Sequence, residues 1–164
     1  MILENYELFI KNIFHKIQEF GIDVSDFEMD HIGYQTSSDE DYDRLKSECE
    51  AMGTMVSEAI VGGRRVGIYQ LHTMLQYQQY RISAFELVAP KEGQICPSAL
   101  EHVEFVLNEP FDSFMKKYPT ISWDTIAIAQ PDFPMIKLKL DKNLQVKFHL
   151  TPVLEIGKKI RRTP

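Results

Sequence analysis

The sequence predicts an α+β chain of mixed α/β character, in which one β-α-β-β-β unit occurs twice after an extra N-terminal helix. Three observations predict this fold class. Apolar residues recur at three- and four-residue steps over the first 20 residues, which is the spacing of one helix face. Strand-like alternation then follows in two blocks, each interrupted by a helix-like stretch after its first strand. Short segments around a histidine also match between the two blocks.

The N-terminal segment, residues 1–22, is predicted to be a helix that ends near Gly21, because glycine commonly follows the last helical turn. The first β-α-β-β-β module spans residues 27–90. Ser37 or Ser38 can cap its helix, and the Gly62-Gly63 pair is typical of a tight hairpin turn. The predicted elements are a strand over 27–36, a helix over 39–52 and strands over 54–61, 64–71 and 81–89.

The second module spans residues 99–152 and follows a polar connection over residues 91–98. Residues 153–164 are expected to form a final helix and a tail. Residues 1–164 are treated as a single domain, since 44% hydrophobic residues in a chain of this length can fill one core. The elements expected in the second module are a strand over 100–107, a helix over 111–118 and strands over 122–129, 135–141 and 144–150.

Charge and composition argue against several kinds of partner. A net charge of -6 opposes binding to nucleic acid or to an anionic membrane surface. No apolar run approaches the roughly 18 residues of a membrane span, and the first residues lack the features of a signal peptide. Cys49 and Cys96 form neither a C-x-x-C motif nor a disulfide framework. A cytoplasmic protein that acts on a small molecule is therefore expected, while the sequence does not specify an oligomeric state.

Two pairs of matching segments suggest a metal site. Asp30-His31-Ile32 matches Glu101-His102-Val103 in the first strands, and Phe85-Glu86-Leu87 matches Phe148-His149-Leu150 in the last strands. The interval between the matched positions is 55 residues from 31 to 86 and 47 from 102 to 149, and we place the excess of eight in a loop over 72–80. If the first and last strands of each module are neighbours, four side chains can converge on one face. Three imidazoles and one carboxylate suit a divalent metal ion, and the predicted ligands are His31, Glu86, His102 and His149.

Further candidates lie near these four positions. Glu104 shares a face with His102 and is a candidate ligand, general base or partner of an imidazole, and Gln35 is a second candidate partner. Lys147 shares a face with His149. Either Arg64 or Arg65 could point inward and grip a carboxylate, since neighbouring strand residues face opposite ways. His15 and His72 are interpreted as structural.

These segments, together with Gly63-Arg64-Arg65-Val66-Gly67-Ile68-Tyr69-Gln70-Leu71, are similar to the YecM family of the vicinal oxygen chelate superfamily, which includes glyoxalase I, extradiol dioxygenases and bleomycin-resistance proteins. The resemblance extends over residues 30–156. It implies a cupped, incomplete barrel from each half with a metal ion between the halves. It also carries the ligand role onto the same four residues, although a glutamate is usual at the position of His149. YecM-like proteins have no settled reaction, so the resemblance implies a fold and a site more than an activity.

The main functional hypothesis is a metal-dependent enzyme of the isomerase, lyase or dioxygenase class that acts on a small oxygen-rich substrate. The ion would be zinc, nickel, cobalt, manganese or iron, and Glu104 or Glu86 would move a proton. Such an enzyme should have a cavity beside Glu104 and either Arg64 or Arg65. The alternatives are a non-catalytic module that binds a small molecule or metal chelate, and a structural domain in which the histidines are merely buried.

Overall fold

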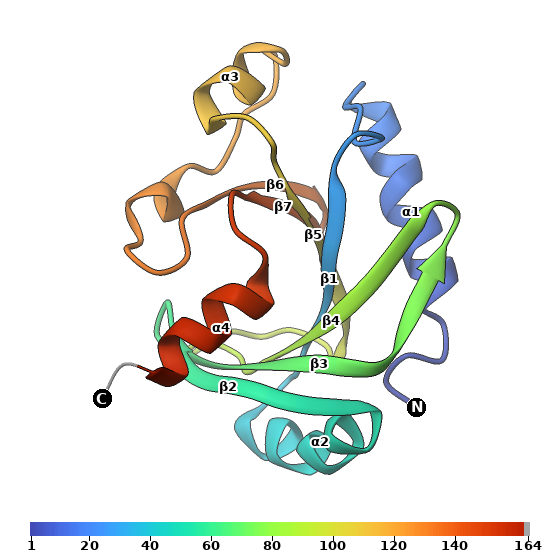
Figure 1. Cartoon of the computed structure of the whole chain (residues 1–164), viewed down its shortest axis with the longest axis vertical. Coiled ribbons are helices and arrows are strands. Elements are labelled where there is room, and N and C mark those ends of the chain that lie inside the picture. Colours follow the sequence, from blue (N-terminus) through green and yellow to red (C-terminus); the bar gives the residue numbers. More distant parts are fainter. Residues whose placement is uncertain (163–164) are drawn as a thin grey trace.

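The computed structural model describes residues 1–162, so the last two residues of the expected C-terminal tail lie outside the described range. Within that range no helix is long and apolar enough to cross a membrane. The helices are α1 (Tyr6–Glu19), α2 (Asp39–Met52), α3 (Phe111–Lys116) and α4 (Val153–Arg162), with a 3-10 helix, η1 (Ile126–Ala129) (Figure 1). The strands are β1 (Glu28–Gln35), β2 (Gly53–Val61), β3 (Arg64–Tyr77), β4 (Tyr80–Val88), β5 (Ala99–Val106), β6 (Met135–Asp141) and β7 (Leu144–His149).

The strands form one open, mixed sheet of seven strands in the order β2-β3-β4-β1-β5-β7-β6. In the first half, β1 pairs with β4 in parallel, and in the second half β5 pairs with β7 in parallel. The two halves meet where β1 and β5 pair antiparallel. The expectation that the first and last strands of each half are neighbours is therefore confirmed.

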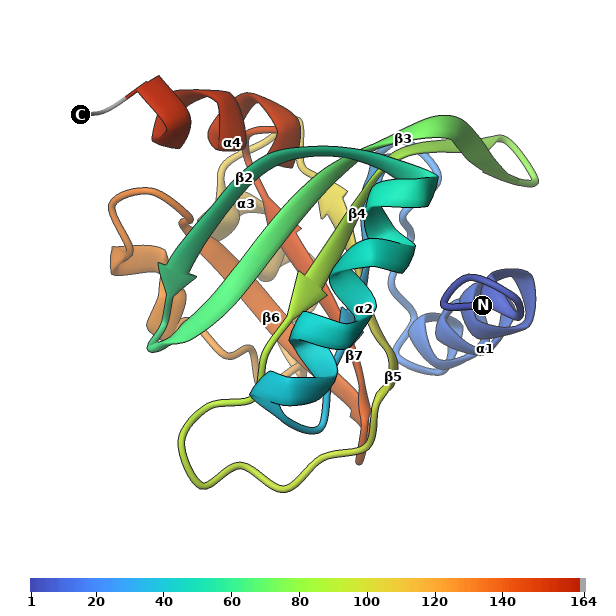
Figure 2. The same cartoon turned by 90° about the horizontal axis from the view of Figure 1, so that it is seen from below.

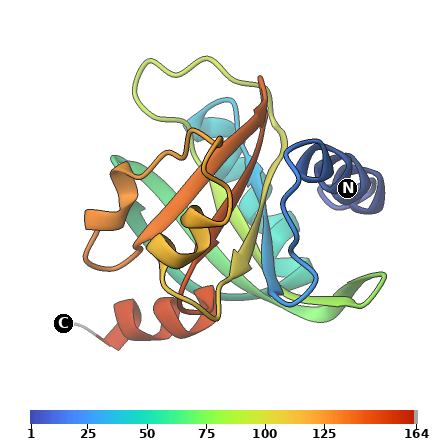
Figure 3. The same ribbon diagram turned by 90° about the horizontal axis from the view of Figure 1, so that it is seen from above.

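The two faces of the sheet are covered differently. α1, α2 and α3 bury one face in the main hydrophobic core, which includes Ile13 of α1, Leu45 of α2 and Phe114 of α3. α4 packs against β2 and β3 on the other face, where Val153 and Ile156 contribute to a smaller core. Figure 2 shows α2 and α4 on opposite sides of β2, β3 and β4, and Figure 3 shows α1 far from α4 across the strands. We call the face under α4 the inner face.

Local signals in the first half are confirmed. The apolar stripe of α1 is buried, and Gly21 follows the helix with a φ of 69°, which a glycine adopts without steric cost. Ser38 caps α2 by accepting a hydrogen bond from the backbone N–H of Asp41. Gly62 and Gly63 both have positive φ between β2 and β3, as a tight hairpin requires.

Two predicted elements are wrong. Residues 122–129 form a single β-bridge, Asp124 to Lys137, followed by η1, because the Asp124 side chain accepts a hydrogen bond from the N–H of Ile126 and turns the chain. The second half therefore has one strand fewer than the first. The predicted loop over 72–80 is instead an extension of the β3–β4 hairpin, which turns at Gln78 with a φ of 51°.

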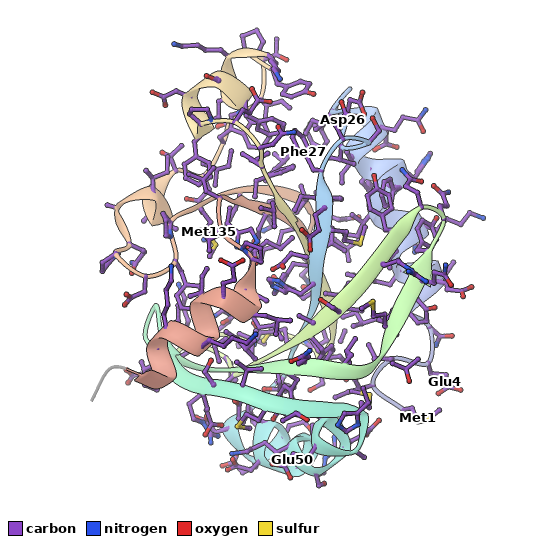
Figure 4. All side chains as sticks on the ribbon, viewed as in Figure 1. Met1, Glu4, Asp26, Phe27, Glu50 and Met135 are labelled. Atoms are coloured by element: carbon purple, nitrogen blue, oxygen red, sulfur yellow. The ribbon has the colours of Figure 1, made fainter. Side chains whose placement is uncertain are left out.

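The first residues of the chain lie beside α2. Met1, Glu4 and Glu50 lie toward the same end in Figure 4, and the N–H of Ile2 donates to Glu48 of α2 at 2.5 Å. α1 and α2 thus cover adjacent parts of the main core, and the inner face is left to α4 and to the segment before β6.

Candidate metal centre

A set of buried polar side chains lies at the centre of the inner face. Strand alternation places them there, since the residues between them, such as Val103 and Phe105 on β5, are in the main core on the opposite face. The same alternation holds on β7, where Val146 and Phe148 are in the main core. The inner-face polar residues are His31, Glu86, His102, Glu104, Lys147 and His149, and each is less than 8% exposed.

His31 bridges two groups of carboxylates through its two ring nitrogens. Its Nδ1 lies 2.8 Å from Oδ2 of Asp30, and its Nε2 lies 2.8 Å from Oε2 of Glu104. Glu86 Oε2 is 3.9 Å from the same Nε2. The Nε2 of His31 therefore faces the interior of the site, where two carboxylates meet.

His102 has the same arrangement. Its Nδ1 lies 2.6 Å from Oε2 of Glu101, while its Nε2 lies 3.1 Å from Oε2 of Glu86 and 3.1 Å from Nζ of Lys147. The rings of His31 and His102 have centroids 5.6 Å apart. The two Nε2 atoms therefore face a common region that also holds Glu86.

The carboxylates on the Nδ1 side come from two β-bulges. The pairing of β1 with β5 skips Asp30 between Met29 and His31, and it skips Glu101 between His102 and Leu100. Adjacent strand residues normally face opposite ways, but a bulge re-aims the extra residue. Each acid can therefore reach the imidazole that follows it.

Sequence reasoning assigned this orienting contact to Glu104 or Gln35, and the structure gives it to Asp30 and Glu101 instead. The sequence feature that could have identified these two residues is the acid directly before each histidine, which occurs in both halves. Asp30 is also anchored, because its Oδ2 accepts a hydrogen bond from the N–H of Val153 at the start of α4. Gln145 donates a hydrogen bond to Glu101.

The predicted equivalence of Glu86 and His149 is wrong. His31 pairs with Ala84 in the first half and His102 pairs with Gln145 in the second, so Glu86 corresponds to Lys147, two residues along each last strand. The two Phe-x-Leu motifs that match in sequence therefore do not occupy corresponding positions in the strand register. A shift of two residues preserves the face, which is why His149 still points to the inner side.

His149 approaches the other side of His31. Its Nε2 lies 3.2 Å from Oδ2 of Asp30, and the ring centroids of His149 and His31 are 6.0 Å apart. His149 thus lies beside the carboxylate that holds the Nδ1 of His31, rather than at the Nε2 atoms that face Glu86 and Glu104.

Gly33 makes room for the ring of His102. Gly33 on β1 is paired with His102 on β5, and a Cβ atom at Gly33 would lie 2.0 Å from Cε1 of His102. This distance is far shorter than any non-bonded carbon contact. The glycine is therefore required by space, and sequence reasoning did not single it out.

The site concentrates ionised carboxylates. Burial would raise the pKa of Glu86, but Lys147 and His102 hold it well below its usual range. Burial likewise opposes the ionisation of Glu101 and Glu104, yet the imidazoles lower the pKa of each to about 2. The pKa of Asp30 is also lowered, because the adjacent imidazoles of His149 and His31 outweigh the effect of its burial.

Positive charge inside the site is scarce. Lys147 is the one lysine among the inner-face polar residues, against the four carboxylates of Asp30, Glu86, Glu101 and Glu104. Burial would lower the pKa of His31, but Glu104 and Asp30 raise it to about 10, so a proton on this ring supplies part of the missing charge. A divalent cation would supply it more fully.

The ligand atoms are compatible with a metal ion. Two buried triads have ligand atoms within 4.8 Å of one another: Asp30 with His31 and His149, and His31 with His102 and Glu104. In the part of the chain that the structure describes, Oε1 of Glu104 has no hydrogen-bond partner, and Nε2 of His31 and Nε2 of His149 lie 2.8 Å and 3.2 Å from carboxylate oxygens without the geometry of a hydrogen bond. Buried polar atoms are rarely left this way unless a water or an ion satisfies them.

A cavity of about 140 Å³ reaches this cluster from the side of β6 and η1. Glu86, Lys147 and Arg64 line it, whereas Glu104 and Arg65 do not. Arg65 lies on the opposite face, where it binds the side chains of Asp39 and Asp43 on α2. One arginine therefore points inward and the other outward, as the strand alternation requires.

His15 and His72 lie far from these contacts. His15 of α1 is exposed and pairs with Glu19 at 3.3 Å. His72 of β3 is exposed and its Nε2 lies 3.2 Å from Oγ1 of Thr54. Neither residue takes part in the two triads, which makes both useful controls.

We predict that Gly33→Ala displaces His102 and weakens metal binding at least about ten-fold, because the imidazole of His102 is moved away from the ion that it would bind. Gly93→Ala is the matched control. It introduces a methyl group into open space at a φ of 74°, so it costs backbone strain without touching the site. Equal metal affinity in the two variants, measured by competition with a chelating dye, would contradict the role given to Gly33.

The depressed pKa values predict loss of stability in acid. Since the folded-state pKa of Glu101 is about 2, its contribution is complete above the unfolded value of 4.5 and is lost as the pH falls toward 2. The free energy of unfolding in urea should therefore fall between pH 5 and pH 3, and fall less steeply in Glu101→Gln. The same slope in both proteins would show that Glu101 is not held by the imidazole of His102.

Comparisons with known proteins agree with this architecture. An uncharacterised protein of Haemophilus influenzae is 26% identical over 100 residues, which are 61% of this chain and 52% of that protein. Protein YecM of Escherichia coli is 27% identical over 90 residues, which are 55% of this chain and 48% of YecM. The chain thus spans about half the length of the curated relatives it matches.

Solved structures share the fold. Protein EC4020 superposes with a TM-score of 0.77 at 22% identity, over 96% of this chain and 90% of its own. Hypothetical protein BH1468 of Bacillus halodurans C-125 gives a TM-score of 0.52 at 12% identity, over 77% of this chain and 96% of its own. The family model described as YecM protein matches residues 1–156. This chain therefore belongs to the YecM family.

Proposed function

We propose that this protein binds one divalent metal ion between β1 and β5, with His31, His102 and Glu104 as its ligands. The observation that carries the proposal is the shared arrangement of the two histidines. Each Nδ1 is held by the acid that precedes it, and each Nε2 faces the region of Glu86 and Glu104. Carboxylates that hold the outer nitrogen of a metal-bound imidazole fix its orientation and raise its basicity.

In this proposal His149 supports the site instead of binding the ion. Its Nε2 approaches Asp30, which in turn contacts the Nδ1 of His31. The set of two histidines and one carboxylate leaves coordination positions open, which a catalytic ion requires. Two histidines and one carboxylate are also the usual ligands of iron in iron-dependent dioxygenases.

We infer that the site is that of a metal-dependent enzyme in the isomerase, lyase or dioxygenase class, acting on a small oxygen-rich molecule. The bound ion would polarise substrate oxygens and stabilise the negative charge that develops on them. Glu86 is the candidate to move a proton, because it lines the cavity and Glu104 does not. Lys147, 3.8 Å from Glu86, helps to keep that carboxylate ionised.

Metal content tests the ligand assignment. His102→Ala and Glu104→Gln should each lower the affinity for Co²⁺ at least about ten-fold, because each removes a ligand. Glu86→Gln should retain Co²⁺, because its amide still fills the same space and Glu86 is assigned to proton transfer. The matched control is His72→Ala, which removes an exposed histidine.

Mass-spectrometric metal analysis after dialysis gives the stoichiometry in all four variants. Unchanged Co²⁺ content in His102→Ala would refute the site. Retention of Co²⁺ in Glu104→Gln with its loss in Glu86→Gln would exchange the roles of the two glutamates. A weak visible spectrum of the Co²⁺ protein, typical of five or six ligands, is expected. An intense four-coordinate spectrum unaffected by added small ligands would instead favour a non-catalytic binding module.

A further inference from the structure

The cavity beside Glu86 is rich in positive charge. Glu86 is the one acidic residue along its wall, in a protein whose net charge is -6. Basic side chains gathered in a recess against the overall charge of a protein attract anions and focus them there. The basic residues that line the cavity are Arg64, Lys91, Lys137 and Lys147.

Arg64 is held in place without being neutralised. Its Nη1 donates to Oε1 of Gln35 at 2.7 Å, and the amide of Gln35 donates in turn to the backbone oxygens of Thr36 and Val88. Among the described residues no carboxylate pairs with Arg64, whereas Lys137 is paired with Asp124 at 3.3 Å. A guanidinium has five N–H donors, so most of those of Arg64 remain available to a ligand.

The neighbouring arginine shows the contrast. Arg65 contacts the carboxylates of Asp39 and Asp43 and lies over the ring of Tyr42, 4.4 Å from its centroid. Its charge is thus used in attaching α2 to the sheet. Arg64 is held only by the amide of Gln35, and backbone oxygens fix this amide in turn. A guanidinium that is held in position but not paired with a carboxylate is preorganised to bind an anion.

We propose that the cavity binds a small organic acid and that Arg64, aided by Lys147, holds the carboxylate of that acid. The role of the other atoms of the acid rests on the proposed metal site. A guanidinium matches the two oxygens of a carboxylate in bidentate geometry. Lys147 is 5% exposed and lines the same cavity, so it meets the acid away from bulk water. Glu86, close to Lys147, disfavours a doubly charged anion such as a phosphate.

The size and walls of the cavity restrict the acid further. A volume of about 140 Å³ is small beside the roughly 300–1,000 Å³ of pockets that hold drug-sized ligands, which favours a ligand of a few carbon atoms. Val66, Phe133 and Met135 supply an apolar wall for a short carbon chain, and Met135 is labelled in Figure 4. Glu86 lines the cavity and lies 3.1 Å from Nε2 of His102. An oxygen on the carbon next to the carboxylate of the bound acid can therefore reach the proposed metal ligands. A 2-oxo or 2-hydroxy acid of a few carbons meets all three conditions.

Calorimetric titration of Co²⁺-loaded protein with pyruvate and with pyruvamide, its uncharged analogue, tests the inference. Pyruvate should bind at least ten-fold more tightly than pyruvamide, and Arg64→Gln should abolish that preference, because the loss of a charge-assisted hydrogen bond is this large. Arg65→Gln is the matched control, since it removes the same charge from the other face and should keep the preference. Inorganic phosphate should compete only weakly.

The outcomes separate this inference from the metal site. If Co²⁺ binds but pyruvate binds no better than pyruvamide, the carboxylate assignment is overturned and the metal proposal stands. The same conclusion follows if Arg65→Gln weakens the binding of pyruvate as much as Arg64→Gln does. If phosphate binds more tightly than pyruvate, the ligand class is wrong. If Co²⁺ does not bind, the titration is made on the metal-free protein: binding of pyruvate that depends on Arg64 supports the carboxylate assignment, and its absence refutes it.

Discussion

The antiparallel pairing of β1 with β5 is the constraint on which the rest of the site depends. It joins the two halves of the sheet and sets His31 opposite Glu104 and His102 opposite Gly33. The same pairing contains both bulges, at Asp30 and Glu101, so a single interface supplies the two imidazoles and the two acids that hold them. A one-residue change in this register would turn the histidines into the main core and leave buried polar groups without partners.

The two halves are related but no longer equal, and their differences open the site on one side. Lys147 stands where the first half has Glu86, and the second half lacks the strand that precedes β6. The replacement of that strand by a bridge and η1 leaves Ile126 and Ala127 at the edge of the cavity. Asymmetry thus gives a cluster of buried carboxylates an entrance lined with positive charge.

Much of the fold and part of the site could be predicted from the sequence, because period-two alternation, helix caps and glycine turns are local signals. The buried positions of His31, Glu86, His102 and His149 on one face followed from alternation. What could not be predicted depends on pairing between distant strands. The roles of Asp30 and Glu101 need the bulges, the correspondence of Glu86 with Lys147 needs the parallel registers, and the need for Gly33 arises only when His102 lies against it.

The central claim is that both histidines present Nε2 to one ion while the preceding acids hold Nδ1. Long-range proton–nitrogen NMR of histidine side chains, recorded during titration with Zn²⁺, tests it most directly, because it distinguishes the two ring nitrogens. We expect Nε2 of His31 and of His102 to shift together on metal binding while each Nδ1 stays protonated, with the exposed His15 and His72 unchanged. Coordination through Nδ1, or a change in only one of the two rings, would contradict the account.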